Sequence, residues 1–253
     1  MTDFIILAAG KGTRLKTETS KALIKVLGIP MIHYTVDLAE STGICSNIFV
    51  VTSNVNREDI EKELSGEKCY FIIQKEQLGT GDAVRSVIDN NANLNDNVLV
   101  LLVDHPLIPL NAILKLNDVH IKGDSPLSMV TACVPNYEGI YAGFYHDGRI
   151  KRDENGNILG IIEPTEATEY EMKIKEINTS LYMFNRDWLI ENMSKIKINE
   201  KKGEYYLTDL VKLAVDQGVK IGSVQIDAKD SAGINTQKDL ETVESFLKEK
   251  NHE

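Results

Sequence analysis

The sequence has few cysteines and no long hydrophobic run, and each shortage excludes a class of protein. Its three cysteines, Cys45, Cys69 and Cys133, lie far apart and form no Cys-x-x-Cys pair. We therefore expect reduced thiols, rather than disulfides or zinc ligands, and a cytoplasmic location. The longest strictly apolar runs are residues 4–9 and 98–103, far short of the roughly 20 residues that cross a membrane. No membrane partner is expected.

Positive charge is also scarce, since 28 Lys and Arg stand against 38 Asp and Glu, giving a formal net charge of −10. This balance argues against a surface for nucleic acid or for anionic lipid as the main role. Asp3 lies where a signal peptide would carry positive charge, and the apolar stretch after it is short, so no leader is expected. The 253 residues, 42% of them hydrophobic, predict one domain over residues 1–253.

Short apolar runs alternate with helical patterns through the first half of the chain. Buried strands are predicted at residues 4–7, 47–52, 70–73 and 97–103, and helices between them at Met31–Ser41, 57–64 and 81–89. Such alternation is typical of an α/β fold with a parallel, doubly wound sheet. From 127 to 184 the strands come faster, with turn signals at Asp147-Gly148 and Asn155-Gly156 that predict hairpins and a more antiparallel lobe. Helices are predicted again at 209–217 and 236–250.

A glycine-containing segment, Leu7-Ala8-Ala9-Gly10-Lys11-Gly12-Thr13-Arg14, follows the first predicted strand. Its glycines allow backbone N–H groups to approach an anion. It is neither a dinucleotide fingerprint, because Leu15 stands at the third glycine position, nor a Walker A loop, because Ile5 stands at the first. A plain turn with solvated lysines is one interpretation. Phosphate binding is favoured because Lys11, Arg14, Lys16 and Lys21 gather in an otherwise acidic protein.

This segment, with Lys21, resembles the signature of the sugar-phosphate nucleotidylyltransferases, and more narrowly that of the uridylyltransferase domain of the bacterial bifunctional N-acetylglucosamine-1-phosphate uridylyltransferases. Seven further blocks match in order, so the resemblance covers nearly the whole chain. They are residues 74–81, 104–108, 148–150, 161–163, 176–179, 203–209 and 233–235. The C-terminal acetyltransferase β-helix of the bifunctional enzymes has no counterpart in this sequence, so we expect no acetyl transfer.

The resemblance implies a Rossmann-like nucleotidyltransferase (GT-A-like) fold. It would contain a mostly parallel mixed sheet flanked by helices and a smaller antiparallel sugar-binding lobe. About 1–110 would form the nucleotide lobe, and about 111–253 the sugar lobe and the return of a metal ligand. The implied reaction joins UTP and N-acetylglucosamine 1-phosphate into UDP-N-acetylglucosamine and pyrophosphate, with Mg²⁺ as cofactor.

The resemblance also implies roles for individual residues. Arg14 and Lys21 match the catalytic pair. The nucleotide-binding residues would be Leu7, Ala8, Ala9, Gly10, Lys11, Gly12, Gln74, Gly79 and Thr80. The sugar-binding residues would be Gly148, Glu163, Asn178 and Thr208. Asp104 and Asn235 match the two metal ligands.

Several of these residues have simpler interpretations when taken alone. Asp104 follows a hydrophobic strand, where open α/β sheets bind ligands, but it also suits a helix N-cap. Asn235 and Thr80 each precede a predicted helix and suit the same role. Mg²⁺ needs only one or two protein oxygens when phosphates complete its shell, so the pair Asp104 and Asn235 is sufficient for the implied site.

Two departures from the family pattern lie on the sugar side. Val103 stands where the family has glycine before the metal-binding Asp, and residues 144–147 replace a proline-containing approach to the Gly-Arg-Ile block. Two alternatives therefore remain open beside the leading one. The first is a nucleotidylyltransferase of this fold with another UDP-sugar or a CDP-alcohol as product. The second is a non-catalytic regulatory subunit. The oligomeric state is not predicted.

Overall fold

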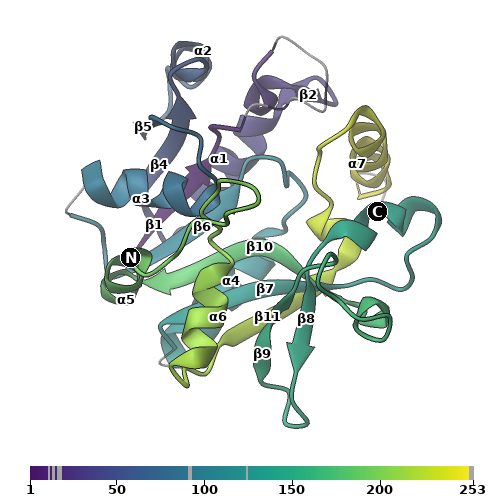
Figure 1. The fold of residues 1–253 in the computed structure, drawn as a ribbon. Helices are drawn as coiled ribbons and strands as arrows, with labels where there is room; N and C mark the ends of the chain where they lie inside the picture. Colours follow the sequence, from purple (N-terminus) through teal and green to yellow (C-terminus); the bar gives the residue numbers. More distant parts are fainter. Residues whose placement is uncertain (11, 13–14, 16–18, 91–92, 124, 251–253) are drawn as a thin grey trace.

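Nine strands of the described part of the chain form one mixed sheet (Figure 1). The computed structural model describes residues 1–10, 12, 15, 19–90, 93–123 and 125–250. Across the sheet the order is β11 (Gly222–Asp227), β7 (Leu127–Cys133), β10 (Glu176–Asn185), β6 (Asn97–Leu102), β1 (Thr2–Leu7), β4 (Cys45–Ser53) and β5 (Cys69–Gln74). Strands β8 (Arg149–Arg152) and β9 (Ile158–Ile162) join through β10.

Alternating side chains of β1 divide the core into two layers. Phe4 and Ile6 face one side and Ile5 and Leu7 the other, as the two-residue period of a strand requires. The first side packs against α1 (Met31–Ser41), α2 (Arg57–Glu63), α4 (Leu110–Lys122) and α7 (Gln237–Lys250). The second packs against α3 (Thr80–Asn90), α5 (Arg186–Met193) and α6 (Asp209–Asp216). A sheet between two helical layers confirms the predicted α/β class.

Strand direction places the ends of four strands at one edge of the sheet. β1 pairs in parallel with β4 and β6, and β4 pairs in parallel with β5. Leu7 lies opposite Leu102, and Ser53 lies opposite Gln74, so the carboxyl ends of these strands are level. Ligands of open α/β sheets bind at this edge.

The predicted antiparallel character of the second half is found in β10. This strand runs antiparallel to β6, β7 and β8, and β8 runs antiparallel to β9. The Asn155-Gly156 signal marks the β8–β9 hairpin, where Gly156 N donates to Asp153 O over 3.0 Å. The hairpin predicted at Asp147-Gly148 is wrong. A 3-10 helix (Gly139–His146) ends there, because Asp147 N donates to Phe144 O.

The predicted strands and helices of the first half are confirmed within about two residues at each end, as are α6 and α7. Among the α-helices and the strands of the large sheet, α4, α5 and β11 were not expected. In α4 the buried Ala112, Ile113 and Leu116 are interleaved with the exposed Leu114 and Ile121, so apolar residues lie all round the helix and obscure its period.

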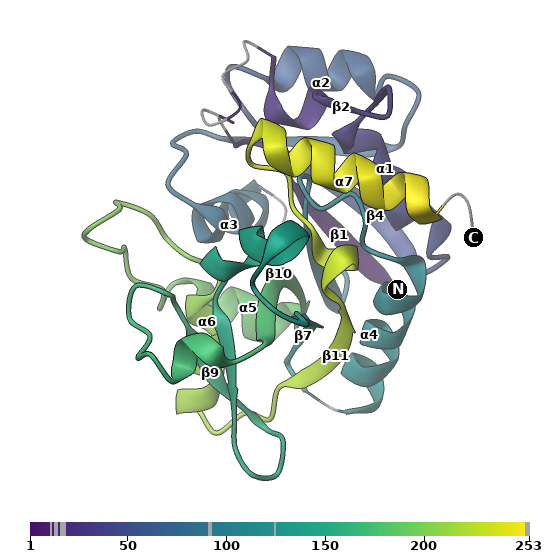
Figure 2. The same ribbon diagram turned by 90° about the vertical axis from the view of Figure 1, so that its right-hand side faces the viewer.

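The last helix returns to the amino-terminal half. Figure 2 shows α7 crossing the molecule next to the small sheet of β2 (Lys25–Val26) and β3 (Ile29–Pro30). Leu27 N, in the turn of that sheet, donates to Glu244 Oε1 of α7 over 2.9 Å. The segment before α7 is thereby carried to the carboxyl edge of the sheet.

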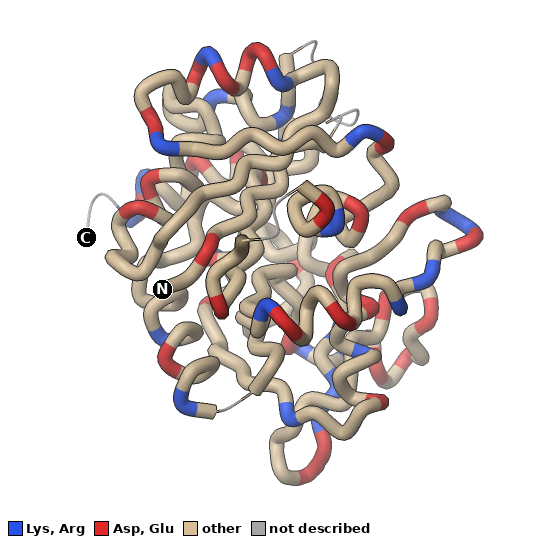
Figure 3. Tube along the Cα trace, turned by 90° about the vertical axis from the view of Figure 1, so that its left-hand side faces the viewer, with Lys and Arg blue, Asp and Glu red and all other residues tan. Residues whose placement is uncertain are grey.

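Charged residues of both signs are interspersed along the described trace (Figure 3). No helix among the described residues combines the length and the apolar character needed to cross a membrane.

Candidate active site

A cavity of about 470 Å³ opens at the carboxyl edge of β1, β5 and β6. Seven residues predicted to bind nucleotide line it, namely Leu7, Ala9, Gly10, Gly12, Gln74, Gly79 and Thr80. Ala8 does not line it, because alternation along the chain turns its side chain into the core, where it is 1% exposed. Lys11 and Arg14 lie outside the described residues. The remaining lining residues are Lys21, Gln77, Ala83, Leu102, Val103, Asp104, Glu204, Tyr206 and Asn235.

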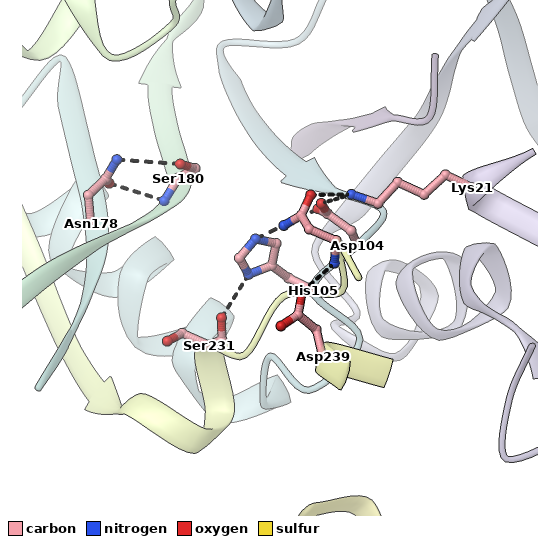
Figure 4. A network of polar contacts seen from close by, with 8 residues as sticks. Lys21, Asp104, His105, Asn178, Ser180, Ser231 and Asp239 are labelled. Atoms are coloured by element: carbon pink, nitrogen blue, oxygen red, sulfur yellow. Dashed lines mark hydrogen bonds and ion pairs between the residues drawn. The ribbon is translucent and has the colours of Figure 1, made fainter. Parts of the chain in front are cut away.

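Three distant segments meet at one end of this cavity. Lys21 begins a 3-10 helix (Lys21–Leu23), Asp104 follows β6, and Asn235 precedes α7. The Lys21 Nζ atom donates to Asp104 Oδ2 and, over 2.9 Å, to Asn235 Oδ1 (Figure 4). Ile234 N also donates to Asp104 O over 2.9 Å, which fixes the two oxygen-bearing segments against each other. We call Lys21, Asp104 and Asn235 the charged triad.

The capping alternatives for two of these residues do not hold in the structure. Thr236 and Asp239 cap α7 reciprocally, because Asp239 N donates to Thr236 Oγ1 over 3.2 Å and Thr236 N donates to Asp239 Oδ2 over 2.8 Å. The helix after Asp104 is α4, whose N-cap is Pro109. Neither Asp104 nor Asn235 is therefore used as a cap.

The Asp104 carboxylate stays ionised in this environment. Burial acts to raise its pKa, but Lys21 and His105 outweigh burial, and the pKa lies below its usual value. His105 Nε2 lies 3.7 Å from Asp104 Oδ1, while Nδ1 lies 2.9 Å from Ser231 O. Since a carbonyl only accepts, Nδ1 carries the proton. No role for His105 was predicted from the sequence, and the structure places it against the triad.

Close packing against Lys21 explains one glycine of the amino-terminal segment. Gly12 has φ +60°, and a Cβ there would lie 2.9 Å from Lys21 Cβ. A side chain at position 12 would therefore displace Lys21 from the other two members of the triad.

At the opposite end of the cavity, the loop before α3 is crossed by residues 204–207. Gly81 N donates to Tyr205 O over 2.8 Å, Tyr205 N donates to Leu78 O over 2.7 Å, and Leu207 N donates to Thr80 Oγ1 over 3.0 Å. Thr80 is thus used to hold this crossing. Gly79 has φ +96°, and a Cβ there would lie 2.6 Å from Tyr205 O.

Two glutamines connect this loop to the rest of the cavity. Gln74 ends β5, and its Nε2 donates to Gly79 O over 3.0 Å and to Asp82 Oδ2 over 2.7 Å. Gln77 Nε2 donates to Ala9 O. Sequence reasoning assigned no role to Gln77 or Asp82. The sequence signal that could have indicated a role for them is their position, since Gln77 lies inside the matching block 74–81 and Asp82 directly follows it.

The residues predicted to bind sugar are not among the described residues that line this cavity. Gly148 O accepts from Asn178 N over 2.9 Å, and a Cβ on Gly148 would lie 3.4 Å from Glu163 Oε1, so these three residues are neighbours. Thr208 precedes α6, which packs on β9. Asn178 Oδ1 accepts from Ser180 N over 3.1 Å and from Tyr182 Oη over 2.9 Å.

A second cavity, of about 170 Å³, lies between the 3-10 helix at Gly139–His146 and the start of α7. Asn235 lines both cavities. Asp147, on the wall of the second, has its pKa raised to about 7 by burial and by the nearby carboxylates of Glu163, Asp239 and Asp104, with Arg149 opposing them.

A family model described as a MobA-like NTP transferase domain matches residues 4–152. The chain is 37% identical over 246 residues to the bifunctional protein GlmU of Caldicellulosiruptor saccharolyticus, covering 97% of this chain and 51% of the relative. It is 34% identical over 244 residues to the protein of that name from Clostridium novyi, covering 96% and 52%. The chain spans about half the length of these curated relatives.

Two solved structures share the fold. One is a CMP:2-keto-3-deoxy-manno-octonic acid synthetase complexed with CTP, with a TM-score of 0.73 and 17% identity over 98% of this chain and 99% of that one. The other is a UDP-glucose pyrophosphorylase complexed with UDP-glucose, with a TM-score of 0.73 and 19% identity over the same shares. These likenesses confirm the predicted nucleotidyltransferase fold. The matching family model, which covers more than half of the sequence, shows that the chain belongs to the family of MobA-like NTP transferase domains.

Proposed function

We propose that this chain transfers a uridylyl group from UTP to N-acetylglucosamine 1-phosphate and releases pyrophosphate. The observation that carries the proposal is the charged triad at one end of a cavity whose other end is the Gln74–Gly79 loop. A nucleotide has a charged triphosphate and a polar, flat base, and the cavity offers a matching group at each end. The resemblance of eight sequence blocks to the uridylyltransferase domain supports the choice of UTP and of this sugar.

The reaction needs charge neutralisation and alignment more than covalent chemistry. An oxygen of the sugar phosphate attacks the α-phosphorus of UTP, the new P–O bond forms, and the bond to the β-phosphate oxygen breaks as pyrophosphate leaves. Both reactants are anions, so an ammonium group beside the reacting phosphates lowers the barrier. Lys21, 9% exposed and held from two sides, is oriented for this role before substrate binds.

The protein residues fit a magnesium ion. Asp104 Oδ2 and Asn235 Oδ1 both contact the Lys21 ammonium, so these two hard oxygens lie close enough together to hold one ion, and an ion bound there would leave the ammonium to the phosphates. In the part of the chain that the structure describes, no group of three or more His, Cys, Asp or Glu could hold a metal. Phosphate oxygens and water would complete the shell, as is usual for Mg²⁺. A bound ion would neutralise charge on the phosphates.

The phosphates would lie against the amino-terminal segment. Gly10 and Gly12 line the cavity, with Gly12 next to Lys21, and glycines in such a segment allow backbone N–H groups to bind an anion. The acceptor would bind on the antiparallel side of the sheet, at the neighbouring Gly148, Glu163 and Asn178 together with Thr208.

A pyrophosphate-release assay tests this proposal. The protein is incubated with Mg²⁺, each of the four common nucleoside triphosphates and a panel of sugar 1-phosphates that includes glucose 1-phosphate. UTP with N-acetylglucosamine 1-phosphate should give the highest kcat/KM. A higher kcat/KM with glucose 1-phosphate would contradict N-acetylglucosamine 1-phosphate as the acceptor. A higher kcat/KM with CTP would contradict UTP as the nucleotide.

A further inference from the structure

The amide of Gln74 is held in one of its two orientations. Its Nε2 donates to Gly79 O over 3.0 Å and to Asp82 Oδ2 over 2.7 Å. A primary amide nitrogen carries two hydrogens, so both are used within the protein. No donor to Oε1 is found among the described residues, and Gln74 lines the larger cavity. The atom left for a ligand is therefore an acceptor.

Asp82 is the stronger of the two groups that hold the amide. Rotating the amide by half a turn would place Oε1 against the Gly79 carbonyl and the Asp82 carboxylate, which both only accept. A hydrogen bond to a charged carboxylate is about twice as strong as one to a neutral carbonyl. Gln74 is 3% exposed, so little water is available to compensate the loss of either contact.

We propose that Asp82 is a positioning residue that makes Gln74 a hydrogen-bond acceptor toward the base, and that it thereby sets a preference for uracil over cytosine. The inference rests on the proposed binding of a pyrimidine nucleotide in this cavity. Uracil carries a hydrogen on N3 and can donate to Oε1. Cytosine has an unprotonated N3, which would meet Oε1 as a second acceptor.

A purely structural role for Asp82 makes a different prediction. Asp82 lies in the first turn of α3, where a negative charge stabilises the helix amino terminus. That effect depends on charge alone and is lost equally in Asp82→Ala and Asp82→Asn. The positioning effect depends on an acceptor oxygen, which the asparagine side chain retains. Gly79 O remains in both variants, so the new amide in Asp82→Asn is expected to turn its oxygen toward Gln74 Nε2.

The experiment measures dissociation constants for UTP and CTP by calorimetry, with Mg²⁺ and without acceptor, for the wild type and both variants. The wild type should prefer UTP. In Asp82→Ala this preference should fall about tenfold, equivalent to about 1.4 kcal/mol, and in Asp82→Asn it should stay within about threefold of wild type. Urea unfolding should show similar losses of stability in the two variants.

Two results would overturn the inference. One is an unchanged UTP-to-CTP ratio in Asp82→Ala, and the other is an equal fall in both variants, which would assign the effect to charge. Because binding is measured without acceptor, the outcome is separate from that of the pyrophosphate assay. A preference for UTP that weakens in Asp82→Ala, without turnover of N-acetylglucosamine 1-phosphate, would support the inference and contradict the proposed acceptor.

Discussion

At the scale of single residues, the site depends on where one ammonium group is held. Lys21 reaches Asp104 and Asn235, which are 83 and 214 positions away in the sequence. The pairing lowers the pKa of Asp104 despite burial. It also fixes a long side chain that would otherwise sample many rotamers, so its charge is in place before substrate arrives.

Replacing Lys21 by alanine should lower kcat/KM by about two to three orders of magnitude, because one charge-assisted contact to a developing charge contributes about 3–4 kcal/mol. Steady-state pyrophosphate release measures this. Lys25, exposed on β2, is the matched control, and Lys25→Ala should keep wild-type activity. A Lys21→Ala enzyme within about threefold of wild type would remove Lys21 from the mechanism.

Residue identities at the site could be predicted from the sequence better than residue geometry. The triad members Lys21, Asp104 and Asn235 were all named, because each lies in a block with the family pattern. The role proposed for Asp82 was not predicted, since it depends on how the Gln74 amide is rotated, and no pattern of residue types encodes that rotation. Ala8 was included with its neighbours although strand alternation turns it into the core.

At the scale of elements, the end of the cavity beside Gln74 and Gly79 is a crossing of two segments. The loop before α3 approaches residues 204–207 so closely that backbone atoms are in contact, and Gly79 has no room for a side chain. The segment around Tyr205 is fixed by Arg85, whose guanidinium lies 4.5 Å from the ring centroid.

Gly79→Ala should lower the free energy of unfolding by about 2 kcal/mol through strain at φ +96°, and should raise the UTP KM more than tenfold. Gly43 is the control, because it has φ +67° with nothing within 4 Å of a built Cβ. Gly43→Ala should lose about 1 kcal/mol and keep the UTP KM. Urea denaturation and initial rates measure both. Equal KM values in the two variants would contradict a role for the crossing.

The contact between α4 and β7 predicts a pH dependence of stability. His120 is 4% exposed and shares a hydrogen bond of 3.0 Å with Ser128 Oγ. Burial lowers the pKa of His120 to about 4 from 6.5. Between these values the unfolded chain binds a proton that the folded chain does not, so stability should fall as pH decreases from about 6.5 to 4, by up to about 3 kcal/mol.

Urea unfolding between pH 7 and pH 4 measures this loss, and the comparison with His120→Gln isolates it. The raised pKa of Asp147 acts in the opposite direction across this whole range, but it is present in both proteins and cancels. The variant should show a shallower slope. Parallel curves would mean that His120 titrates normally in the fold.

Whether a helix or strand could be predicted from the sequence depended on how its apolar residues are distributed between buried and exposed faces. Strands β1 and β6 are buried on both sides and were predicted from apolar runs alone. The strand β11 was not predicted, because it lies at an edge and Val224 and Ile226 alternate with polar residues over only six positions. The α4 helix was not predicted because its exposed apolar residues obscure the period.

At the scale of the whole molecule, one sheet joins two sets of candidate residues. The described residues predicted for the nucleotide lie at or after the ends of β1 and β5 and at the start of α3. Those predicted for the sugar lie just before β8, just after β9, on β10 and before α6. The charged triad lies after β6, and β6 pairs with β1 on one side and β10 on the other. A donor bound on one side and an acceptor bound on the other would thus meet beside Lys21.

This arrangement predicts that a substitution can change the affinity for the sugar phosphate without changing the affinity for UTP. Glu163 is exposed and lies beside Gly148, and partial desolvation together with the nearby Glu166 and Asp209 raises the pKa of its carboxyl group. If the Glu163 carboxylate accepts hydrogen bonds from the sugar phosphate, Glu163→Gln should raise the KM for N-acetylglucosamine 1-phosphate about tenfold or more. This is the usual effect of losing a hydrogen bond to a charged group. The UTP dissociation constant should stay within about threefold of wild type, because the cavity that holds Gln74 does not include Glu163.

The neighbouring exposed Glu166 gives the matched control, and Glu166→Gln removes the same charge from the same region without touching Gly148.

Initial rates with N-acetylglucosamine 1-phosphate and with glucose 1-phosphate, at saturating UTP, complete the test. We expect the wild type to prefer the first by about 100-fold, below the 10⁴–10⁵-fold limit for polar recognition, because Val103 and residues 144–147 depart from the family pattern. That preference should shrink in Glu163→Gln and persist in Glu166→Gln. A Glu163→Gln enzyme that loses UTP affinity while keeping its acceptor KM would place Glu163 on the nucleotide side and contradict the division.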